Sequence, residues 1–206
     1  MHKPAFLITI DTEGDNLWQK HDSITTENAR YLPRFQQLCE KYGFKPVWLT
    51  NYEMAIDPVY IEFAKDAIAR GTAEIGMHLH AWNSPPTDPL TDDDWRHKPY
   101  LIEYSDAAMR AKVDYMTRLL EDTFQTKMVS HRAGRWAFDE RYARLLVEYG
   151  YLVDCSVTPR VNWKTAKGAP QGDGGTDYRD FPQHAYFLDE NDIRRSEERR
   201  VGKECR

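Results

Sequence analysis

Cysteine is scarce in this chain, which has three cysteines among 206 residues. Cys39, Cys155 and Cys205 stand far apart, without the close pairs that ligate zinc or build a disulfide framework. The sequence also lacks the run of roughly 18 apolar residues that a membrane-spanning helix needs. These absences argue against a disulfide-stapled scaffold, a cysteine-ligated metal and a membrane span.

The chain also lacks a basic patch and a secretory leader. Its net charge is -5 and no stripe of Lys and Arg stands out, so we do not expect nucleic acid as a partner. Residues 1–4 lead directly into an apolar run, without the charged and apolar regions of a signal peptide, and we expect a cytoplasmic protein. The length suffices for one domain with a real core, and nothing in the sequence indicates the oligomeric state.

The segment 195–206 differs in character from the rest of the chain. It has no apolar periodicity, and it resembles the translation of a short-read sequencing adapter, whose first codons read Arg-Ser-Glu-Glu as at residues 195–198. Such segments are set aside in reasoning about a fold. We therefore expect one domain over 1–194 that is truncated at its C-terminal end, followed by an exposed, disordered foreign tail over 195–206.

The rest of the chain alternates between strand and helix patterns. Gly43, Gly71 and Gly150 each follow an amphipathic run and precede an apolar run, as expected for glycine at the C-terminal end of a helix. Repeated helix–Gly–strand units favour parallel strands joined by crossover helices, either as an α/β barrel or as an open doubly wound sheet. The expected strands are 6–10, 46–50, 74–80, 128–131 and 152–157, and the expected helices are 27–42, 58–70, one after Ser105 and one around 142–149. Segments 81–104 and 162–180 are expected to be long loops.

Acids, histidines and an arginine stand at the ends of three expected strands, where parallel barrels collect their reactive groups. His78 and His80 are two residues apart, so on a strand both imidazoles point to one face and can reach one ion. Together with one carboxylate they make a set typical of Zn²⁺ or another divalent metal. An isolated His-x-His is more often one structural and one incidental histidine, but the neighbouring acids and arginine favour a metal site.

The acids Asp11, Glu13 and Asp15 follow the first expected strand at two-residue spacing. Metal-dependent hydrolysis needs one carboxylate on the metal and a second one as a base. Asp15 competes with Glu13 for the ligand role, and the alternative is that these acids only cap a turn. Arg132 can pair with a carboxylate and hold it oriented.

Three further residues are candidates for supporting roles. Trp82 and Trp136 could form a wall on which a sugar ring stacks, or they could pack in the core. Asp154, on the fifth expected strand, could support the site from behind the ligands, or it could be an ordinary cap.

In this order, these residues resemble the motifs of the polysaccharide deacetylase (NodB-homology, carbohydrate esterase) family. The run Thr9 to Glu13 is similar to the first family motif, Thr-Phe-Asp-Asp, with the metal carboxylate moved from the adjacent position to Glu13. His78-Leu79-His80 is similar to a shortened second motif, and the run Arg132 to Trp136 is similar to the third. The family's Leu-x-His motif, which carries the general-acid histidine, is not found before residue 195.

The resemblance implies a distorted (β/α)7-type barrel that removes acetyl groups from N-acetylated, less often O-acetylated, sugars of an envelope polysaccharide or its precursor. It implies that Asp11 is the base, that Arg132 supports it, and that Glu13, His78 and His80 hold the metal, with zinc expected. Because the general acid is not found, we expect this chain to bind metal and to hydrolyse slowly. Two other functions stay open: hydrolysis of small cyclic amides by an allantoinase-like relative, and carbohydrate binding by a pseudoenzyme.

Overall fold

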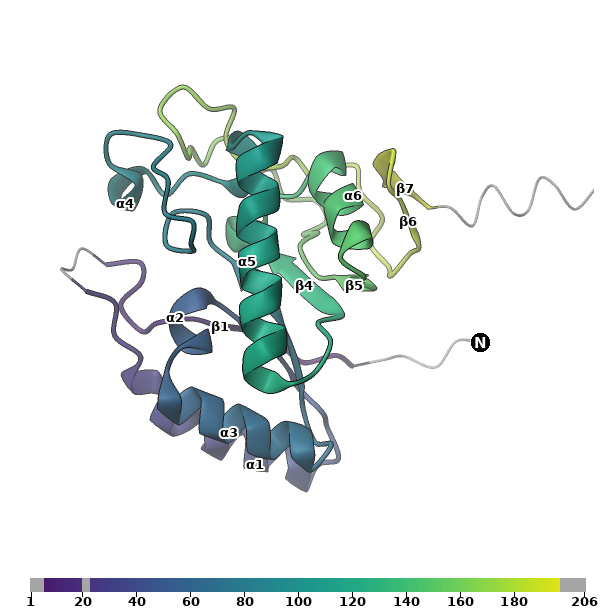
Figure 1. Cartoon of the computed structure of the whole chain (residues 1–206). Helices are drawn as coiled ribbons and strands as arrows, with labels where there is room; N and C mark the ends of the chain where they lie inside the picture. Colours follow the sequence, from purple (N-terminus) through teal and green to yellow (C-terminus); the bar gives the residue numbers. More distant parts are fainter. Residues whose placement is uncertain (1–5, 20–22, 197–206) are drawn as a thin grey trace, which may run out of the picture.

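A five-stranded parallel sheet organises the computed structural model, which describes residues 6–19 and 23–196 (Figure 1). The strands lie side by side in chain order: β1 (Thr9–Thr12), β2 (Val47–Thr50), β3 (Glu74–Leu79), β4 (Ser130–Ala133) and β5 (Val153–Asp154). An order that never reverses is the winding of a barrel, whereas a doubly wound sheet reverses its order partway. The expected barrel-type α/β fold is therefore confirmed over five successive strands, with β1 and β5 at the two edges.

Helices connect each strand to the next. They are α1 (Leu32–Lys41), α2 (Tyr52–Ala55), α3 (Pro58–Ala69), α4 (Asp94–His97), α5 (Asp106–Phe124) and α6 (Glu140–Glu148), with the 3-10 turns η1 (Glu27–Tyr31), η2 (Leu101–Glu103) and η3 (Gly134–Trp136). The long helix α5 runs between α3 and α6 and contacts both (Figure 1). Within the described residues, no helix combines the length and the apolar character that crossing a membrane requires.

The helix ends follow the signals in the sequence. The Asp57 carboxylate accepts a hydrogen bond from the Tyr60 N–H at 2.7 Å and so caps α3, and the Ser105 hydroxyl caps α5 in the same way. A left-handed glycine follows α1, α3 and α6, with φ of +74° at Gly43, +66° at Gly71 and +84° at Gly150.

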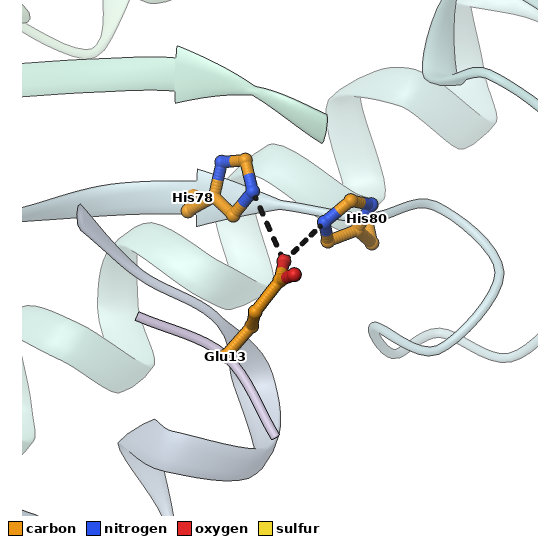
Figure 2. A group of neighbouring side chains, drawn as sticks. All are labelled: Glu13, His78 and His80. Carbon is orange, nitrogen blue, oxygen red and sulfur yellow. Dashed lines mark hydrogen bonds and ion pairs between the residues drawn. The ribbon is translucent and has the colours of Figure 1, made fainter. Parts of the chain in front are cut away.

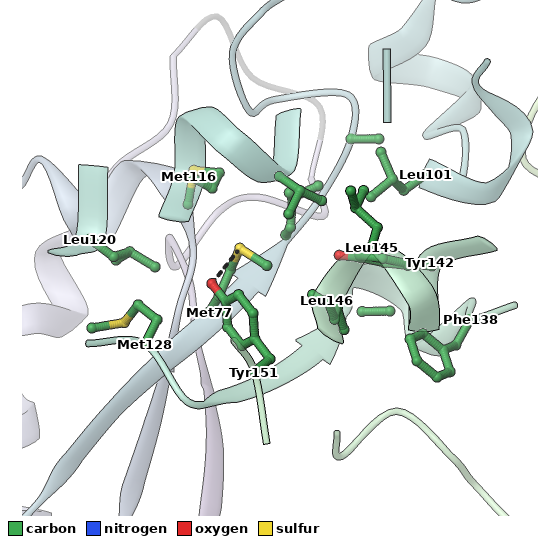
Figure 3. Close-up of a cluster of buried hydrophobic side chains, with 14 of the residues drawn as sticks. Met77, Leu101, Met116, Leu120, Met128, Phe138, Tyr142, Leu145, Leu146 and Tyr151 are labelled. Atoms are coloured by element: carbon green, nitrogen blue, oxygen red, sulfur yellow. Dashed lines mark hydrogen bonds between the residues drawn. The ribbon is translucent and has the colours of Figure 1, made fainter. Parts of the chain in front are cut away.

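The two faces of strand β3 differ in character. One carries Met77 and Leu79, and the other, called the polar face below, carries His78 and His80. Met77 and Leu79 are fully buried among helix side chains, and the Tyr151 hydroxyl donates to the Met77 sulfur at 3.4 Å (Figure 3). Because side chains alternate along a strand, His78 and His80 point to the opposite face. Packing of the core residues therefore fixes the direction in which the histidines point.

Three strands lie a few residues from their expected positions. The first strand was expected at 6–10, but β1 begins at Thr9, and Phe6 and Leu7 are largely exposed. The fourth was expected at 128–131 and lies at Ser130–Ala133, and the fifth shrinks from 152–157 to Val153–Asp154. Apolar composition marks a buried run, but pairing with the neighbouring strand decides where the strand begins. The shift places Asp11 and Arg132 within strands, so their direction is fixed by the sheet.

The two long segments differ in how they are ordered. Segment 81–104 contains α4 and η2 and is tied to α5 by Lys112, whose ammonium donates to the carbonyl oxygens of Ser84 and Pro86 at 2.8 and 2.5 Å. Segment 162–180 has a single isolated bridge, between Asn162 and Asp177, and is otherwise a loop as expected.

A short antiparallel hairpin ends the described part of the chain. It pairs β6 (Leu188–Asp189) with β7 (Asp192–Ser196). The domain boundary expected after residue 194 falls inside β7, so residues 195 and 196 belong to a strand and not to a disordered tail. Residues 197–206 of the expected tail lie outside the described residues.

The close packing of β3 leads to a prediction for Gly76. A Cβ added there would lie 2.3 Å from the Ser130 hydroxyl oxygen and 2.8 Å from a Leu49 methyl group. Gly76→Ala should lower the free energy of unfolding by about 3 kcal/mol, measured by urea denaturation, because the sheet must shift to admit the methyl group. The control is Gly43→Ala, which meets no atom within 4 Å and should cost about 1 kcal/mol for its left-handed backbone. An equal loss in the two variants would contradict the close packing.

Candidate metal site

Two histidines and a glutamate meet on the polar face of the sheet (Figure 2). The Glu13 Oε2 lies 2.9 Å from the His80 Nε2 and 3.5 Å from the His78 Nε2, and the three potential ligand atoms all lie within 4.8 Å of one another. Both histidines are buried, and the carboxylate reaches them from the loop after β1. This is the only such group of His, Cys, Asp or Glu in the described part of the chain.

The hydrogen bonds of His78 favour metal binding. Its Nδ1 lies 2.9 Å from the carbonyl oxygen of Arg132, and a carbonyl only accepts, so this nitrogen carries a proton. The His78 Nε2 faces the Glu13 carboxylate at 3.5 Å, and this nitrogen could offer its lone pair to a cation that displaces its proton. A histidine that donates from one nitrogen to a carbonyl and offers the other is the usual arrangement of a metal-bound imidazole. Two nitrogens and one carboxylate oxygen, with further positions open, suit Zn²⁺.

The pKa values of the three side chains in the cluster shift in different directions. Burial opposes ionisation of Glu13, but hydrogen bonds from His78 and His80 outweigh it and hold the pKa of the carboxyl well below its usual range. Burial also lowers the pKa of His78, but the hydrogen bond to Glu13 and the charge of Asp11 outweigh it, so the net pKa is raised. Burial and the neighbouring His78 lower the pKa of His80 to about 4. The cluster thus offers an ionised carboxylate and a neutral imidazole to a cation.

Asp11 and Arg132 form an ion pair on the same face. The Arg132 guanidinium donates to the Asp11 Oδ1 at 2.6 Å, and it also contacts the Thr9 hydroxyl at 2.5 Å and the Cys155 carbonyl at 2.9 Å. From β4 it therefore contacts both β1 and the residue that follows β5. The ion pair holds the carboxylate of Asp11 in one orientation. The sequence analysis expected Arg132 to pair with a carboxylate in this way.

The tryptophans are arranged differently from the sequence expectation. Trp82 is 5% exposed and packs on the His80 ring with centroids 4.3 Å apart, so it offers no open wall. Trp136 stacks on Trp163 at 5.1 Å with the rings 16° from parallel. Trp18, which the sequence analysis missed, is 49% exposed, and its Nε1 donates to the Glu13 Oε1 at 2.5 Å. A lone tryptophan in a loop carries no sequence signal for that contact.

Two acids expected at the site lie elsewhere. The Asp15 carboxylate accepts from the Thr25 hydroxyl at 2.9 Å and the Glu27 N–H at 2.8 Å, so it orders the approach to η1 and does not compete with Glu13 as a ligand. Asp154 accepts from the His131 Nδ1 at 2.7 Å.

The Asp154 contact belongs to the helix side of the sheet. The His131 Nε2 lies 2.7 Å from the hydroxyl of Tyr142 on α6, and His131 alternates along β4 with Arg132, which faces the site. Asp154 therefore contributes to the packing of α6 on the sheet, through His131, and not to the cluster of Glu13, His78 and His80. The sequence could not show this, because the direction of β5 depends on its pairing with β4.

Comparison with known proteins supports the fold. Neither a protein-family model nor a curated protein sequence matches the chain. Among solved structures, the chain is similar to a candidate polysaccharide deacetylase from Mycobacterium smegmatis (TM-score 0.53, 16% identity, 74% of this chain and 50% of the other). It is also similar to a CE4 family pseudoenzyme from Bacillus anthracis (0.50, 14%, 77% and 45%) and to a mutant of that pseudoenzyme with restored enzymatic activity (0.50, 16%, 77% and 47%).

These similarities establish a shared fold. The chain has the fold of CE4 family polysaccharide deacetylases, and it spans about half the length of the structures that it matches.

The geometry predicts that the chain binds one Zn²⁺ and that Glu13 is the carboxylate ligand. Glu13→Gln should weaken Zn²⁺ binding at least about 100-fold in isothermal titration calorimetry, because even changes outside the ligand set cost 10- to 100-fold. Asp15→Asn is the matched control, since it makes the same carboxylate-to-amide change in the same loop but faces Thr25, and it should bind as the wild type does. Equal affinities for the wild type and Glu13→Gln would rule out Glu13 as a ligand.

Proposed function

On the fold that the chain shares with CE4 family polysaccharide deacetylases, we propose a metal-dependent hydrolase that removes acetyl groups from N-acetylated or O-acetylated sugars of an envelope polysaccharide or its precursor. The observation that carries the proposal is the meeting of Glu13, His78 and His80 beside the ion pair of Asp11 and Arg132. Zinc held by the first three residues would polarise the acetyl carbonyl and make an attacking water more acidic.

Asp11 is the base in this proposal. Its Oδ1 is engaged by the Arg132 guanidinium, and no hydrogen bond involves its Oδ2 within the described residues, so that oxygen is available to accept a proton from the attacking water. Water adds to the acetyl carbon as Asp11 takes one of its protons. The carbon–nitrogen bond of the acetamide then breaks as Asp11 passes that proton to the nitrogen, and the products are acetic acid and the free sugar amine, which exchange a proton to give acetate and the ammonium form. Arg132 keeps the Asp11 carboxylate oriented throughout. A general base must be held in the correct position relative to the water that it deprotonates.

Aromatic rings near the ligands provide surfaces for a sugar. Trp18 is half exposed and packs edge-on against His80, with ring centroids 5.2 Å apart. Because the ring of Trp18 contacts both His80 and Glu13 and remains half exposed, we assign the sugar-stacking role to Trp18 in place of the buried Trp82. Trp136, stacked on Trp163 after β4, is retained as a second contact. Flat apolar rings suit the apolar face of a pyranose, and the polar edge of the indole suits its hydroxyl groups.

Carbohydrate binding without catalysis is the second candidate function. It is favoured by the similarity to a CE4 family pseudoenzyme, because that fold is compatible with both outcomes. The two candidates differ in whether acetate is released.

The proposal predicts that Asp11→Asn abolishes activity and keeps the metal. Acetate release from N-acetylated chito-oligosaccharides should fall by about 10²- to 10⁴-fold, because the amide accepts no proton from water. Zinc content measured by elemental analysis should stay near one per chain. Asp15→Asn should match the wild type in both measurements.

Three other results would change the assignment. Loss of zinc in Asp11→Asn would make Asp11 a ligand and not the base. Oligosaccharide binding without acetate release by the wild type would support the pseudoenzyme function. Failure of the wild type to bind either zinc or oligosaccharide would overturn both.

A further inference from the structure

Glu53 is a buried carboxylate that the proposed mechanism does not use. It lies in the first turn of α2, just after β2, and is 7% exposed. Burial raises the pKa of its carboxyl, and the nearby charge of Glu13 adds to that rise. Within the described residues no Lys, Arg or His forms an ion pair with it. Such a group is costly to bury, so packing alone does not explain its presence.

The carboxylate joins the loops that follow three neighbouring strands. Its Oε1 accepts from the Gly14 N–H at 2.7 Å and from the Asn51 side-chain amide at 3.2 Å, and its Oε2 accepts from the Asn83 side-chain amide at 2.8 Å. Gly14 follows β1, Asn51 follows β2 and Asn83 follows β3. One side chain thus receives a donor from each loop.

Two of these contacts are next to proposed metal ligands. Gly14 is the residue after Glu13, so its N–H belongs to the peptide that sets the position of the Glu13 backbone. Asn83 is three residues beyond His80, at the start of the long segment 81–104. Glu13 follows β1 and His80 follows β3. The 2.9 Å contact between them therefore requires the two loops to be held in a fixed position relative to each other.

Within the described residues, the bond to Glu53 is the only hydrogen bond of the Asn83 side chain. The Asn83 Oδ1 is buried without a hydrogen-bond partner, so no other hydrogen bond sets the direction of the amide. This has a testable consequence, because a glutamine at position 53 could keep all three contacts. Its oxygen would accept from Gly14 and Asn51, and its amide would donate to Asn83 after that side chain turns over.

We infer that Glu53 is a positioning residue, which holds the Glu13 backbone and the loop after His80 together so that both ligands meet one ion. The inference rests on the proposed function for the identity of the ligands. Glu53 acts through hydrogen bonds to the loops and contacts neither the ion nor the substrate. Its role therefore depends on its hydrogen bonds to the three loops and on the loop positions that these bonds fix, and not on its charge.

The first test compares Glu53→Ala, Glu53→Gln and Asp154→Ala in the full chain. Asp154→Ala is the matched control, because it removes another carboxylate with several hydrogen bonds but on the helix side of the sheet. Zn²⁺ affinity should fall about 10- to 100-fold in Glu53→Ala, the range for residues that orient ligands. Affinity should stay near the wild-type value in Glu53→Gln and in Asp154→Ala. The visible spectrum of bound Co²⁺ should change only in Glu53→Ala.

The second test does not need a metal. Amide hydrogen exchange of Gly14, followed by NMR on the metal-free protein, should accelerate in Glu53→Ala and stay slow in Glu53→Gln and Asp154→Ala. Wild-type Zn²⁺ affinity in Glu53→Ala, equal weakening in Asp154→Ala, or an unchanged Gly14 exchange rate would each overturn the inference. If the wild type binds no Zn²⁺ and Gly14 exchange still behaves as expected, the proposed function fails while the ordering role of Glu53 stands.

Discussion

Strand β3 lies in the middle of the sheet and is buried on both of its faces, and the arrangement of the candidate site depends on that constraint. Met77 and Leu79 are fixed by the core against α5, so His78 and His80 must point the other way. A slip of one residue in the pairing of β3 would move both imidazoles into the core and both apolar side chains out of it. The packing that stabilises the fold and the geometry that binds an ion are therefore set by the same register.

The polar face of the sheet stays ordered because its charges have partners. Glu13 lies against two imidazoles and Asp11 against Arg132, so the carboxylates on this face do not remain as uncompensated charges. The helix side has one polar chain of its own, from Asp154 through His131 to Tyr142. Neighbouring residues of β4, His131 and Arg132, belong to these two separate systems. Alternation along a strand is enough to keep the two polar networks on opposite faces of the sheet.

Similarity of fold does not by itself assign an activity, and the matched structures illustrate this. They include a CE4 family pseudoenzyme and a mutant of it with restored enzymatic activity, both at 16% identity or less to this chain. Function on such a scaffold depends on a few side chains at the strand ends. For this chain we propose that those side chains are Asp11, Glu13, His78 and His80, and their convergence supports the proposed hydrolase more than the fold does.

The sequence by itself determined the order of the five parallel strands and of the four longer helices, the helix ends at Gly43, Gly71 and Gly150, and the placement of His78 and His80 on one face. These follow from local chemistry, because periodicity, capping and left-handed glycines act within a few residues. It also placed acids and an arginine at strand ends, which was enough to expect that they meet. The carboxyl ends of parallel strands lie at the same end of the sheet, independently of how the connecting segments fold.

Only the tertiary structure decided which groups meet. Asp15 and Glu13 are equivalent candidates in the sequence, but Asp15 is engaged by Thr25 and Glu27, so only Glu13 reaches the histidines. Trp18 takes the exposed position expected for Trp82, and Glu53 enters from a helix with no motif to mark it. The contacts of Glu13 with His80 and of Glu53 with Gly14 join residues 67 and 39 positions apart, and those of Asp15 and Trp18 depend on how the loop after β1 folds. Strand register and loop packing set such contacts, and local sequence patterns carry no record of them.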